Sequence, residues 1–350
     1  MLILAAVTIA ALSGDNGILR NAANAKQETE RAQVVEQAQV DILGKQADNT
    51  SAELGRDEIK EVLDNYFITV PDDFTSDTDL KTKPEYGDYT IKVSEIYSGE
   101  IEEAKEIISN EESFVGYYAD MDPTDGKIDG IIYADLAKGG KGVWNDDSWS
   151  GYEYSAVTDG LKEYYVSGEY TDQYFKTKQV LSPIEGSGTV DRFYVMALED
   201  FTTSDYTTFY WYDNAYGKLN RPINTDYDDF GEGKANTIAM VNDWNNNTAT
   251  YGAQNERDLW GVIQNGSYEI VTSESDSGKW FVPSKAEWSA FGDAFKITSS
   301  NYDDVYGLNN YYWSSSQNTA YNAYSAYFNY GFISNYNVNN GNCVRLSATF

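Results

Sequence analysis

The chain has no histidine and a single cysteine, Cys343, among its 350 residues. Without histidine it lacks the side chain most often used for acid–base catalysis near neutral pH, and the usual ligand of zinc and copper. One cysteine excludes an intrachain disulfide and any chemistry that needs a pair of thiols. The sequence also has no phosphate-binding Gly-Lys-Ser/Thr loop and no Gly-x-Ser-x-Gly nucleophile motif. We therefore expect a protein without enzymatic activity.

Basic residues are also scarce. The chain has 25 Lys and Arg against 56 Asp and Glu, a formal net charge of −31. Nucleic acids and anionic membrane surfaces are bound through Lys and Arg, so neither is expected as the main partner. The acidity is typical of a protein that stays soluble outside the cell.

Charge of either sign is missing near the C-terminus. Residues 305–344 contain no Asp, Glu, Lys or Arg, although these make up 23% of the chain. The last part of this stretch, residues 317–343, consists almost entirely of Asn, Tyr, Ala, Ser, Phe and Gly. Tyr, Ser, Asn and Gly are also the main residues of antibody binding loops, because Tyr offers rigid contact area and Ser and Asn adapt their hydrogen bonds. The composition predicts a recognition surface; the alternative is a low-complexity Asn/Tyr tail.

The length predicts two or three domains, and the pattern predicts an α+β fold. Apolar residues recur at helical spacing over Ile18–Leu43 and Glu53–Phe67, and Tyr89–Ile96 alternates like a strand. We expect a long N-terminal helix at residues 1–48, a small α/β unit at residues 49–109 and a larger domain at residues 110–350.

In the larger domain, short aromatic-rich strands alternate with Gly and Asp turns. They are expected at Gly130–Leu136, Gly160–Tyr165, Asp191–Leu198 and Thr208–Trp211. Two helices are expected among them, Lys234–Trp244 and Ser284–Phe295. The second should begin with a capping box, in which Ser284 and Glu287 satisfy each other's free backbone donors.

The N-terminal segment combines the apolar run Met1–Leu12, a Gly-Asp-Asn-Gly-Ile break at Gly14–Ile18 and an Ala/Lys/Glu/Gln-rich continuation. Over residues 1–48 it resembles the type IV pilin-like proteins of Gram-positive gut bacteria. The resemblance implies a helix that anchors the subunit in the membrane and later packs in a filament core. The alternative is an ordinary amphipathic helix that packs on its own domain.

Three pieces of the C-terminal domain resemble C-type-lectin-like domains of the formylglycine-generating-enzyme type. They are Lys279–Trp288, Tyr312–Ser316 and Val344–Arg345, in the order of the strand–helix, the following strand and the closing strand of that fold. The segment Gly231–Gly261 resembles the same domains less specifically. The catalytic members of that group use active-site cysteines, so with Cys343 alone their activity is not expected here.

Between these anchors, the Asn/Tyr-rich residues 318–343 resemble the variable region of the variable proteins of diversity-generating retroelements. The resemblance implies adenine-directed mutagenesis that rewrites Asn-type codons at solvent-facing positions of a fixed scaffold. Changing the first two bases of an Asn codon never gives Trp, Gln, Lys, Glu or Met. None of these five residues occurs between Asn318 and Cys343.

The resemblance implies a variable, ligand-binding set and a constant scaffold. The variable set is Thr319, Tyr321, Tyr324, Ser325, Tyr327, Tyr330, Phe332, Ser334, Tyr336, Val338, Gly341 and Cys343. The scaffold set is Trp313, Ala323, Ala326, Phe328, Gly331, Ile333 and Val344. Strand alternation predicts that Ala326 and Phe328 face inward while Ser325 and Tyr327 face outward.

These features together predict an extracellular, adhesin-like protein that is displayed on a cell surface or pilus. Its partner would be a protein or glycan on a cell, phage or host surface, and other pilin subunits for the N-terminal helix. The alternative is a structural minor pilin whose Tyr/Asn-rich tail packs between filament subunits.

One acidic loop suggests a cofactor, a calcium ion. Four aspartates, Asp120, Asp122, Asp125 and Asp129, surround Gly126, and closely spaced aspartates at a Gly turn can gather the oxygen ligands that Ca²⁺ prefers. The spacing has one residue too many for an EF-hand loop. A plain acidic turn is the alternative.

Overall fold

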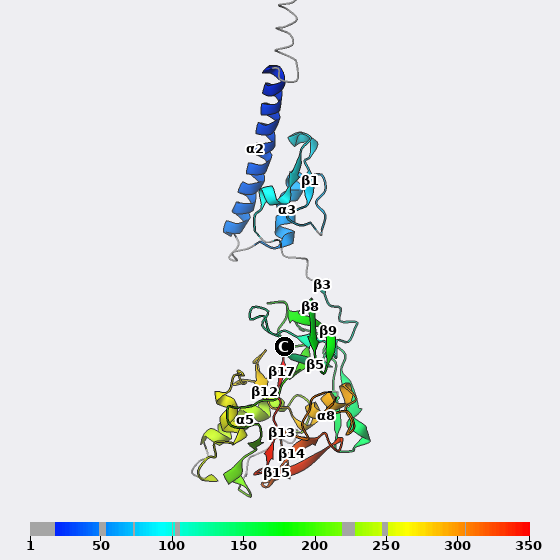
Figure 1. Cartoon of the computed structure of the whole chain (residues 1–350), viewed down its shortest axis with the longest axis vertical. Coiled ribbons are helices and arrows are strands. Elements are labelled where there is room, and N and C mark those ends of the chain that lie inside the picture. Colours follow the sequence, from blue (N-terminus) through cyan, green and yellow to red (C-terminus); the bar gives the residue numbers. More distant parts are fainter. Residues whose placement is uncertain are drawn as a thin grey trace, which may run out of the picture. The chain divides into compact units, whose positions relative to one another are not determined.

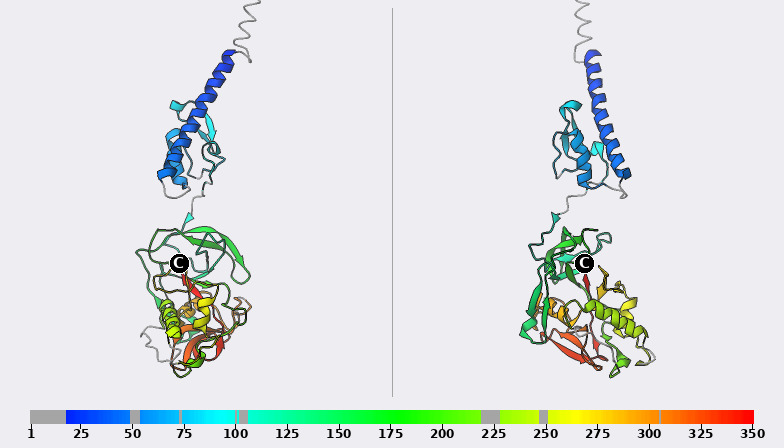
Figure 2. Two further views of the ribbon diagram at one scale, coloured as in Figure 1. Left: turned by 90° about the vertical axis from the view of Figure 1, so that its left-hand side faces the viewer. Right: turned by 180° about the vertical axis from the view of Figure 1, so that it is seen from behind.

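The computed structural model describes residues 18–48, 54–72, 74–99, 101, 106–218, 228–246, 251–304 and 306–350. The chain forms two compact units, Met1–Ala104 and Lys105–Phe350 (Figures 1 and 2). Each mixes helices and strands, so the predicted α+β class is confirmed. The division after Ala104 lies close to the limit predicted at residue 109. The predicted apolar run at residues 1–12 and most of the break that follows it lie outside the described residues.

The first unit is built around one long helix. Its elements are α2 (Ile18–Asp48), α3 (Arg56–Tyr66), β1 (Asp79–Lys81), η1 (Pro84–Tyr86), β2 (Thr90–Lys92) and α4 (Val93–Ile96). Along α2, Val34, Ala38 and Ile42 recur every four residues and are buried, which places them on one stripe of the helix. This stripe shares a hydrophobic core with Ile59 and Leu63 of α3. The predicted amphipathic helix is confirmed, and it packs with the small unit that follows it.

The strand predicted over Tyr89–Ile96 is wrong in its second half. Thr90–Lys92 form β2, which pairs with β1 in an antiparallel register, but Val93–Ile96 form the short helix α4. The Glu95 carboxylate accepts a hydrogen bond from the backbone N–H of Lys92 (3.1 Å), which favours a helical turn at this point. Val93 and Ile96, three residues apart, are then both buried.

The second unit contains an eight-stranded sheet in the order β12-β17-β10-β5-β4-β9-β8-β3. Its strands are β3 (Glu106–Ile107), β4 (Tyr118–Ala119), β5 (Gly130–Asp135), β8 (Tyr164–Asp172), β9 (Lys176–Pro183), β10 (Phe193–Ala197), β12 (Trp280–Phe281) and β17 (Ser347–Thr349). Neighbours are antiparallel except β4 and β9, which are parallel. The predicted strands at Gly130–Leu136 and Asp191–Leu198 match β5 and β10, whereas Gly160–Tyr165 overlaps β8 only at its last two residues.

The other elements of this unit lie outside the eight-stranded sheet. They are β6 (Gly140–Val143), η2 (Trp144–Asp146), β7 (Gly151–Tyr154), β11 (Phe209–Tyr210), η3 (Asp213–Ala215), α5 (Gly233–Asn246), α7 (Leu259–Val262), η4 (Ile263–Asn265), α8 (Lys285–Ala294), β13 (Tyr311–Gln317), β14 (Asn322–Tyr327), β15 (Phe332–Asn337) and β16 (Gly341–Asn342). Strands β13, β14 and β15 form a three-stranded antiparallel sheet. Helix α8 contacts both β5 of the large sheet and β13 and β14 of the small one (Figure 1). The helices predicted at Lys234–Trp244 and Ser284–Phe295 are confirmed as α5 and α8.

Two aromatic cores of this unit lie next to the three-stranded sheet. One contains Trp144, Trp288 and Phe328, and the other contains Trp211 and Trp313. The three-stranded sheet contributes residues to both. Each face of this sheet is therefore at least partly covered by one of the two cores.

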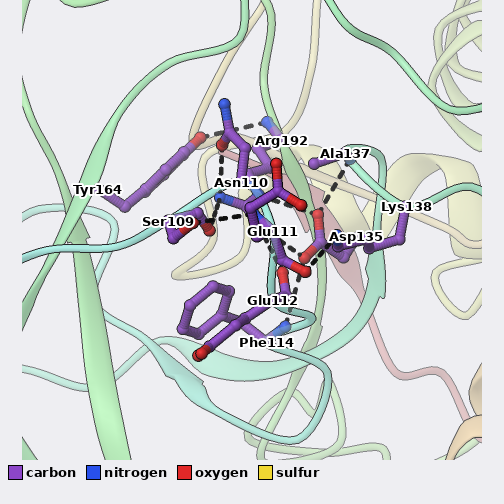
Figure 3. Close-up of polar contacts among 10 residues, drawn as sticks. All are labelled: Ser109, Asn110, Glu111, Glu112, Phe114, Asp135, Ala137, Lys138, Tyr164 and Arg192. Carbon is purple, nitrogen blue, oxygen red and sulfur yellow. Dashed lines mark hydrogen bonds and ion pairs between the residues drawn. The ribbon is translucent and has the colours of Figure 1, made fainter.

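A buried ion pair fixes the start of the second unit (Figure 3). Arg192 and Asp135 are each 1% exposed, and two parallel hydrogen bonds of 2.9 Å join the guanidinium to the carboxylate. The remaining Arg192 N–H groups donate to the backbone carbonyls of Ser109 and Glu112 and to the side chain of Asn110. The Asp135 carboxylate also accepts from backbone N–H groups. All this ties the segment at residues 109–112 to β5 and β10.

Candidate functional site

The predicted variable residues lie mainly on β14, β15 and their connections. In the register of this sheet, Tyr327 of β14 lies opposite Tyr311 of β13 and Phe332 of β15. Since directly opposite side chains project from the same face, these three rings form a row across the sheet. Tyr330 in the β14–β15 turn and Tyr336 at the end of β15 extend the row.

The five rings contact one another, and we call them the tyrosine face: Tyr311, Tyr327, Tyr330, Phe332 and Tyr336. The ring of Tyr327 lies with its centroid 4.9 Å from Tyr311, 5.6 Å from Phe332 and 5.9 Å from Tyr336. Tyr330 stacks on Phe332 at 5.7 Å and is 61% exposed, while the other four rings are half-buried. Their mutual packing holds these rings in place on a sheet.

The tyrosine face carries no formal charge. The pKa of the Tyr327 hydroxyl is well above its ordinary value, first because of burial and then because Tyr336 and Tyr311 are close. The hydroxyl therefore stays protonated at physiological pH and donates to the backbone carbonyl of Asn335 (3.3 Å). The Asn329 side chain donates to the hydroxyl of Tyr311 (3.2 Å). A neutral surface of rings, hydroxyls and amides can make apolar contacts and hydrogen bonds.

Tyr321 lies at the opposite end of β14 from Tyr330, in the β13–β14 turn. It is 50% exposed and packs edge to face on Tyr216, with ring centroids 5.1 Å apart. The Thr319 hydroxyl holds the turn by accepting from the backbone N–H groups of Tyr321 (3.1 Å) and Asn322 (3.2 Å). The exposed predicted residues thus lie at both ends of the hairpin.

Four residues of the predicted variable set are buried, which corrects their assignment to an exposed face. Tyr324 is 8% exposed, Ser325 and Val338 are 0% exposed and Cys343 is 9% exposed. The Ser325 hydroxyl donates to the Tyr312 carbonyl and accepts from the Asn342 side chain, so it is fully used inside the protein. Burial also raises the pKa of the Cys343 thiol to about 12.

The physical reason is that one side of the small sheet is open at one end and covered at the other. Ser325 lies opposite Trp313, as Tyr327 lies opposite Tyr311. Trp313 belongs to the second core, together with Trp211 and Val338, and this core covers the sheet around Ser325. For Ser325, alternation identified the correct side of the strand but not the cover over it. Tyr324 and Cys343 are buried for another reason, because both belong to the first core, and Tyr324 projects to the opposite side of β14 from Ser325.

Eight members of the set remain at least partly exposed. They are Thr319, Tyr321, Tyr327, Tyr330, Phe332, Ser334, Tyr336 and Gly341. All seven predicted scaffold residues are buried, as expected. Gly331 shows why one of them cannot change. Its φ of +75° is the left-handed region, and a Cβ there would lie 2.7 Å from the Asn145 side chain.

The anchor residues form the support of this surface. The indole N–H of Trp288 donates to the Trp313 carbonyl (3.0 Å), and that of Trp313 donates to the Phe209 carbonyl (2.7 Å). The expected capping box of α8 is present, since Ser284 Oγ accepts from Glu287 N (3.2 Å) and Glu287 Oε2 accepts from Ser284 N (2.7 Å).

The Glu287 carboxylate, part of this capping box, has a pKa in the range of a general acid. Burial raises its pKa to about 7. Its other oxygen, however, accepts from the backbone N–H groups of Gly231 (3.1 Å) and Gly233 (3.3 Å). The side chain is fully buried and fastens the start of α5 to α8, a structural role.

Arg345 and Asp200 form a second support beneath the sheet. Arg345 is almost fully buried and donates to the Asp200 carboxylate (2.8 Å), which also accepts from the Tyr312 hydroxyl (2.9 Å) and the Asn309 side chain (2.7 Å). Asp200 precedes Arg345 by 145 residues, so no local pattern in the sequence pairs the two.

The predicted calcium site is not supported. Three of the aspartates are used by the loop itself: Asp122 accepts from Thr124 N (3.1 Å), Asp125 from Lys127 N (2.8 Å) and Asp129 from Met121 N (2.6 Å). Burial, with Asp129 and Asp125 nearby, raises the pKa of Asp120 to about 6. Across the described residues, which include all four aspartates, no group of three or more His, Cys, Asp or Glu side chains could hold a metal ion. The loop matches the plain acidic turn.

Sequence reasoning missed Tyr311 and Tyr216 as members of the exposed aromatic surface. A signal for Tyr311 was available, because alternation along β13 places it on the opposite side from the buried Tyr312. No comparable signal exists for Tyr216, which reaches Tyr321 only through the fold.

No helix within the described ranges is both long and apolar enough to cross a membrane. Comparison of the chain with protein-family models, with curated proteins and with solved structures gave no match.

Proposed function

We propose that the protein binds macromolecular ligands through the tyrosine face of a C-type-lectin-like domain, and that this face is diversified by a retroelement. The observation that carries the proposal is a connected set of exposed rings on a small sheet whose other residues are fixed in two cores. Solvent-facing positions can then change while the framework stays constant. The diversified set is the eight exposed residues, and the four buried ones belong to the scaffold.

The available contact area supports a binding role. Aromatic side chains bury about 150–250 Å² each, so one ring that is 61% exposed and four that are mostly buried offer on the order of 300 Å². That is within the range of the largest patch on an ordinary monomer, about 300–600 Å², which is often functional. Because the rings already pack on one another, little side-chain freedom is lost on binding.

Display outside the cell is part of the same proposal. The net charge of −31, the single cysteine and the long α2 helix of the first unit suit a pilin-like, surface-attached protein. The partner would be a protein or glycan on another cell, a phage or a host surface.

Two displayed libraries test the binding role. In the first, the exposed positions Tyr321, Tyr327, Tyr330 and Tyr336 are varied; in the matched control, the buried positions Tyr324, Ser325, Val338 and Cys343 are varied. We expect the first library to fold and to yield binders against a panel of unrelated purified proteins. We expect most of the second to fail a protease-resistance screen for folding. Equal folding of both libraries, or no binders from the first, would contradict the proposal.

Sequencing tests the diversification separately. Deep sequencing of the 3′ end of the gene in a growing population should show changes at adenines of the exposed codons and none at Trp313 or Phe328. A constant 3′ end in a population with an active reverse transcriptase would refute it. Chemical labelling of tyrosines on intact cells addresses the minor-pilin alternative, which requires Tyr330 to be covered by a neighbouring subunit.

A further inference from the structure

A cleft of about 630 Å³ lies on the other side of the small sheet from the tyrosine face. Its walls come from the β6–β7 hairpin, from Asp228 to Phe230 and from the first turn of α8. One wall residue, Lys285, holds its Nζ 4.5 Å above the ring of Tyr324. Tyr324 and Tyr327 are three residues apart on β14, so they project to opposite faces. The cleft is of the size that small ligands occupy, about 300–1,000 Å³.

The charged groups of the cleft are paired with each other. Lys285 Nζ lies 2.6 Å from the Asp228 carboxylate, and Lys141 Nζ lies 2.6 Å from the Glu153 carboxylate. With Asp229, the lining carries two positive and three negative side chains, nearly balanced in a chain of −31. Neither sign is in clear excess, so an ionic ligand gains little. Paired charges still offer strong donors and acceptors to neutral groups such as hydroxyls.

Aromatic rings border the same cleft. Tyr152 and Phe230 line it; the Tyr152 hydroxyl donates to Asp293 (2.7 Å) and Phe230 stacks on Tyr154 at 4.3 Å. Beyond Tyr324, at a centroid distance of 6.3 Å, lies Trp149, which is 50% exposed. Of the tryptophans in the described residues, it alone is largely exposed to solvent. Trp149 does not itself line the cleft, but it lies two residues before Gly151, which does, and its exposed indole offers a flat apolar surface beside it.

The loop that carries Trp149 is held in place. It joins β6 to β7, and its Asn145 side chain donates to the carbonyls of Ile297 (2.9 Å) and Gly331 (3.2 Å). The Ser150 hydroxyl accepts from the backbone N–H of Ile333 (3.0 Å). Asn145 and Asp146 both have positive φ, +50° and +58°, an unusual conformation for residues other than glycine. This rigidity means that a ligand need not order the loop.

We infer that this cleft binds a neutral saccharide, with Trp149 as the platform for a sugar ring and the Lys285–Asp228 pair as the contact for its hydroxyls. A sugar presents C–H groups on one face and hydroxyls, which both donate and accept, around its edge. That combination fits exposed rings beside paired charges. The site is independent of the tyrosine face and does not rest on its proposed role.

The test uses the full chain, multimerised through a tag, on a printed array of neutral mono- to tetrasaccharides, followed by calorimetric titration of the best-bound sugar. We expect saturable binding that Trp149→Ala weakens at least tenfold and that Tyr330→Ala, an exposed aromatic residue of the tyrosine face, leaves unchanged. Urea unfolding checks that both variants fold.

Three results would overturn the inference: no saccharide above background on the array, equal affinity of the Trp149→Ala variant, or loss of binding in Tyr330→Ala. Tighter calorimetric binding of the zwitterion glycylglycine than of any sugar would also overturn it. The third result would place sugar binding on the tyrosine face and so leave the proposed function standing.

Discussion

Replacing Val338 and Tyr330 by Asn, one at a time, separates an exposed variable position from a buried one. Asn is the residue from which the proposed mutagenesis starts, so every truly variable position must accept it. Both residues belong to the sequence-predicted variable set, yet Tyr330 is 61% exposed and Val338 is 0% exposed. The introduced Asn side chain is therefore exposed to solvent at position 330 and buried in an apolar core at position 338.

The expected magnitudes differ several-fold. Val338→Asn loses the burial of a valine side chain, about 1.5–3 kcal/mol. It also buries an amide without a prepared partner in the second core, which costs about 1–3 kcal/mol more. The sum is about 2.5–6 kcal/mol. Tyr330→Asn removes ring contacts at the surface, and surface changes usually alter the free energy of unfolding by about 0.5 kcal/mol or less.

Urea unfolding followed by tryptophan fluorescence measures this cleanly, because all eight tryptophans lie in the second unit. With a slope of about 2–3 kcal/mol per molar urea, we expect the midpoint of Val338→Asn to fall by about 1–2 M at unchanged slope, and that of Tyr330→Asn to stay within about 0.3 M. Similar midpoints for the two variants would refute the division of the predicted set into exposed and buried members.

Three further outcomes follow from buried groups. Arg192→Met leaves the Asp135 carboxylate buried without its cation, so the free energy of unfolding should fall by about 3–5 kcal/mol in urea titrations; adding Asp135→Leu should restore part of it, and no restoration would contradict the pairing. Because burial raises the pKa of Glu287 from 4.5 to about 7, the folded chain holds this proton more tightly than the unfolded chain. Its stabilisation is therefore full below pH 4.5 and is lost as the pH rises to 7, and Glu287→Gln should flatten this part of the stability–pH profile. The Cys343 thiol, with its pKa raised to about 12, should react with iodoacetamide at pH 8 only as fast as the unit unfolds, and rapid labelling of the native protein would show that it is accessible.

The sequence predicted those helices and strands that depend on residues close together in the chain. The Ser284–Glu287 capping box set the start of α8, and the helical spacing of apolar residues predicted that α2 is amphipathic, with Ala38 and Ile42 on its buried side. The inward positions Ala326 and Phe328 could also be predicted, because alternation along one strand needs no knowledge of its neighbours.

What the sequence could not reveal depends on residues far apart in the chain. Ser325 is buried because the second core, with Trp211 and Trp313, covers it. The residues next to Ser325 in the sequence do not indicate that this core lies over them. Asp200 and Arg345 pair across the domain in the same way. The acidic loop differs, because the cause of its pattern is local: Asp122, Asp125 and Asp129 each accept from a backbone N–H group of the same loop, so turn formation accounts for these three aspartates.

The Arg192–Asp135 pair has a mechanical consequence for a surface-attached protein. Tension applied through the first unit would reach the second at its N-terminal segment, where Arg192 holds the backbone carbonyls of Ser109 and Glu112 and the side-chain oxygen of Asn110. The load passes from there into β5 and β10, in the middle of the eight-stranded sheet. Strands β13, β14 and β15 form a separate sheet outside this line of force, so under the proposed surface display tension on the first unit would not pull directly on the tyrosine face.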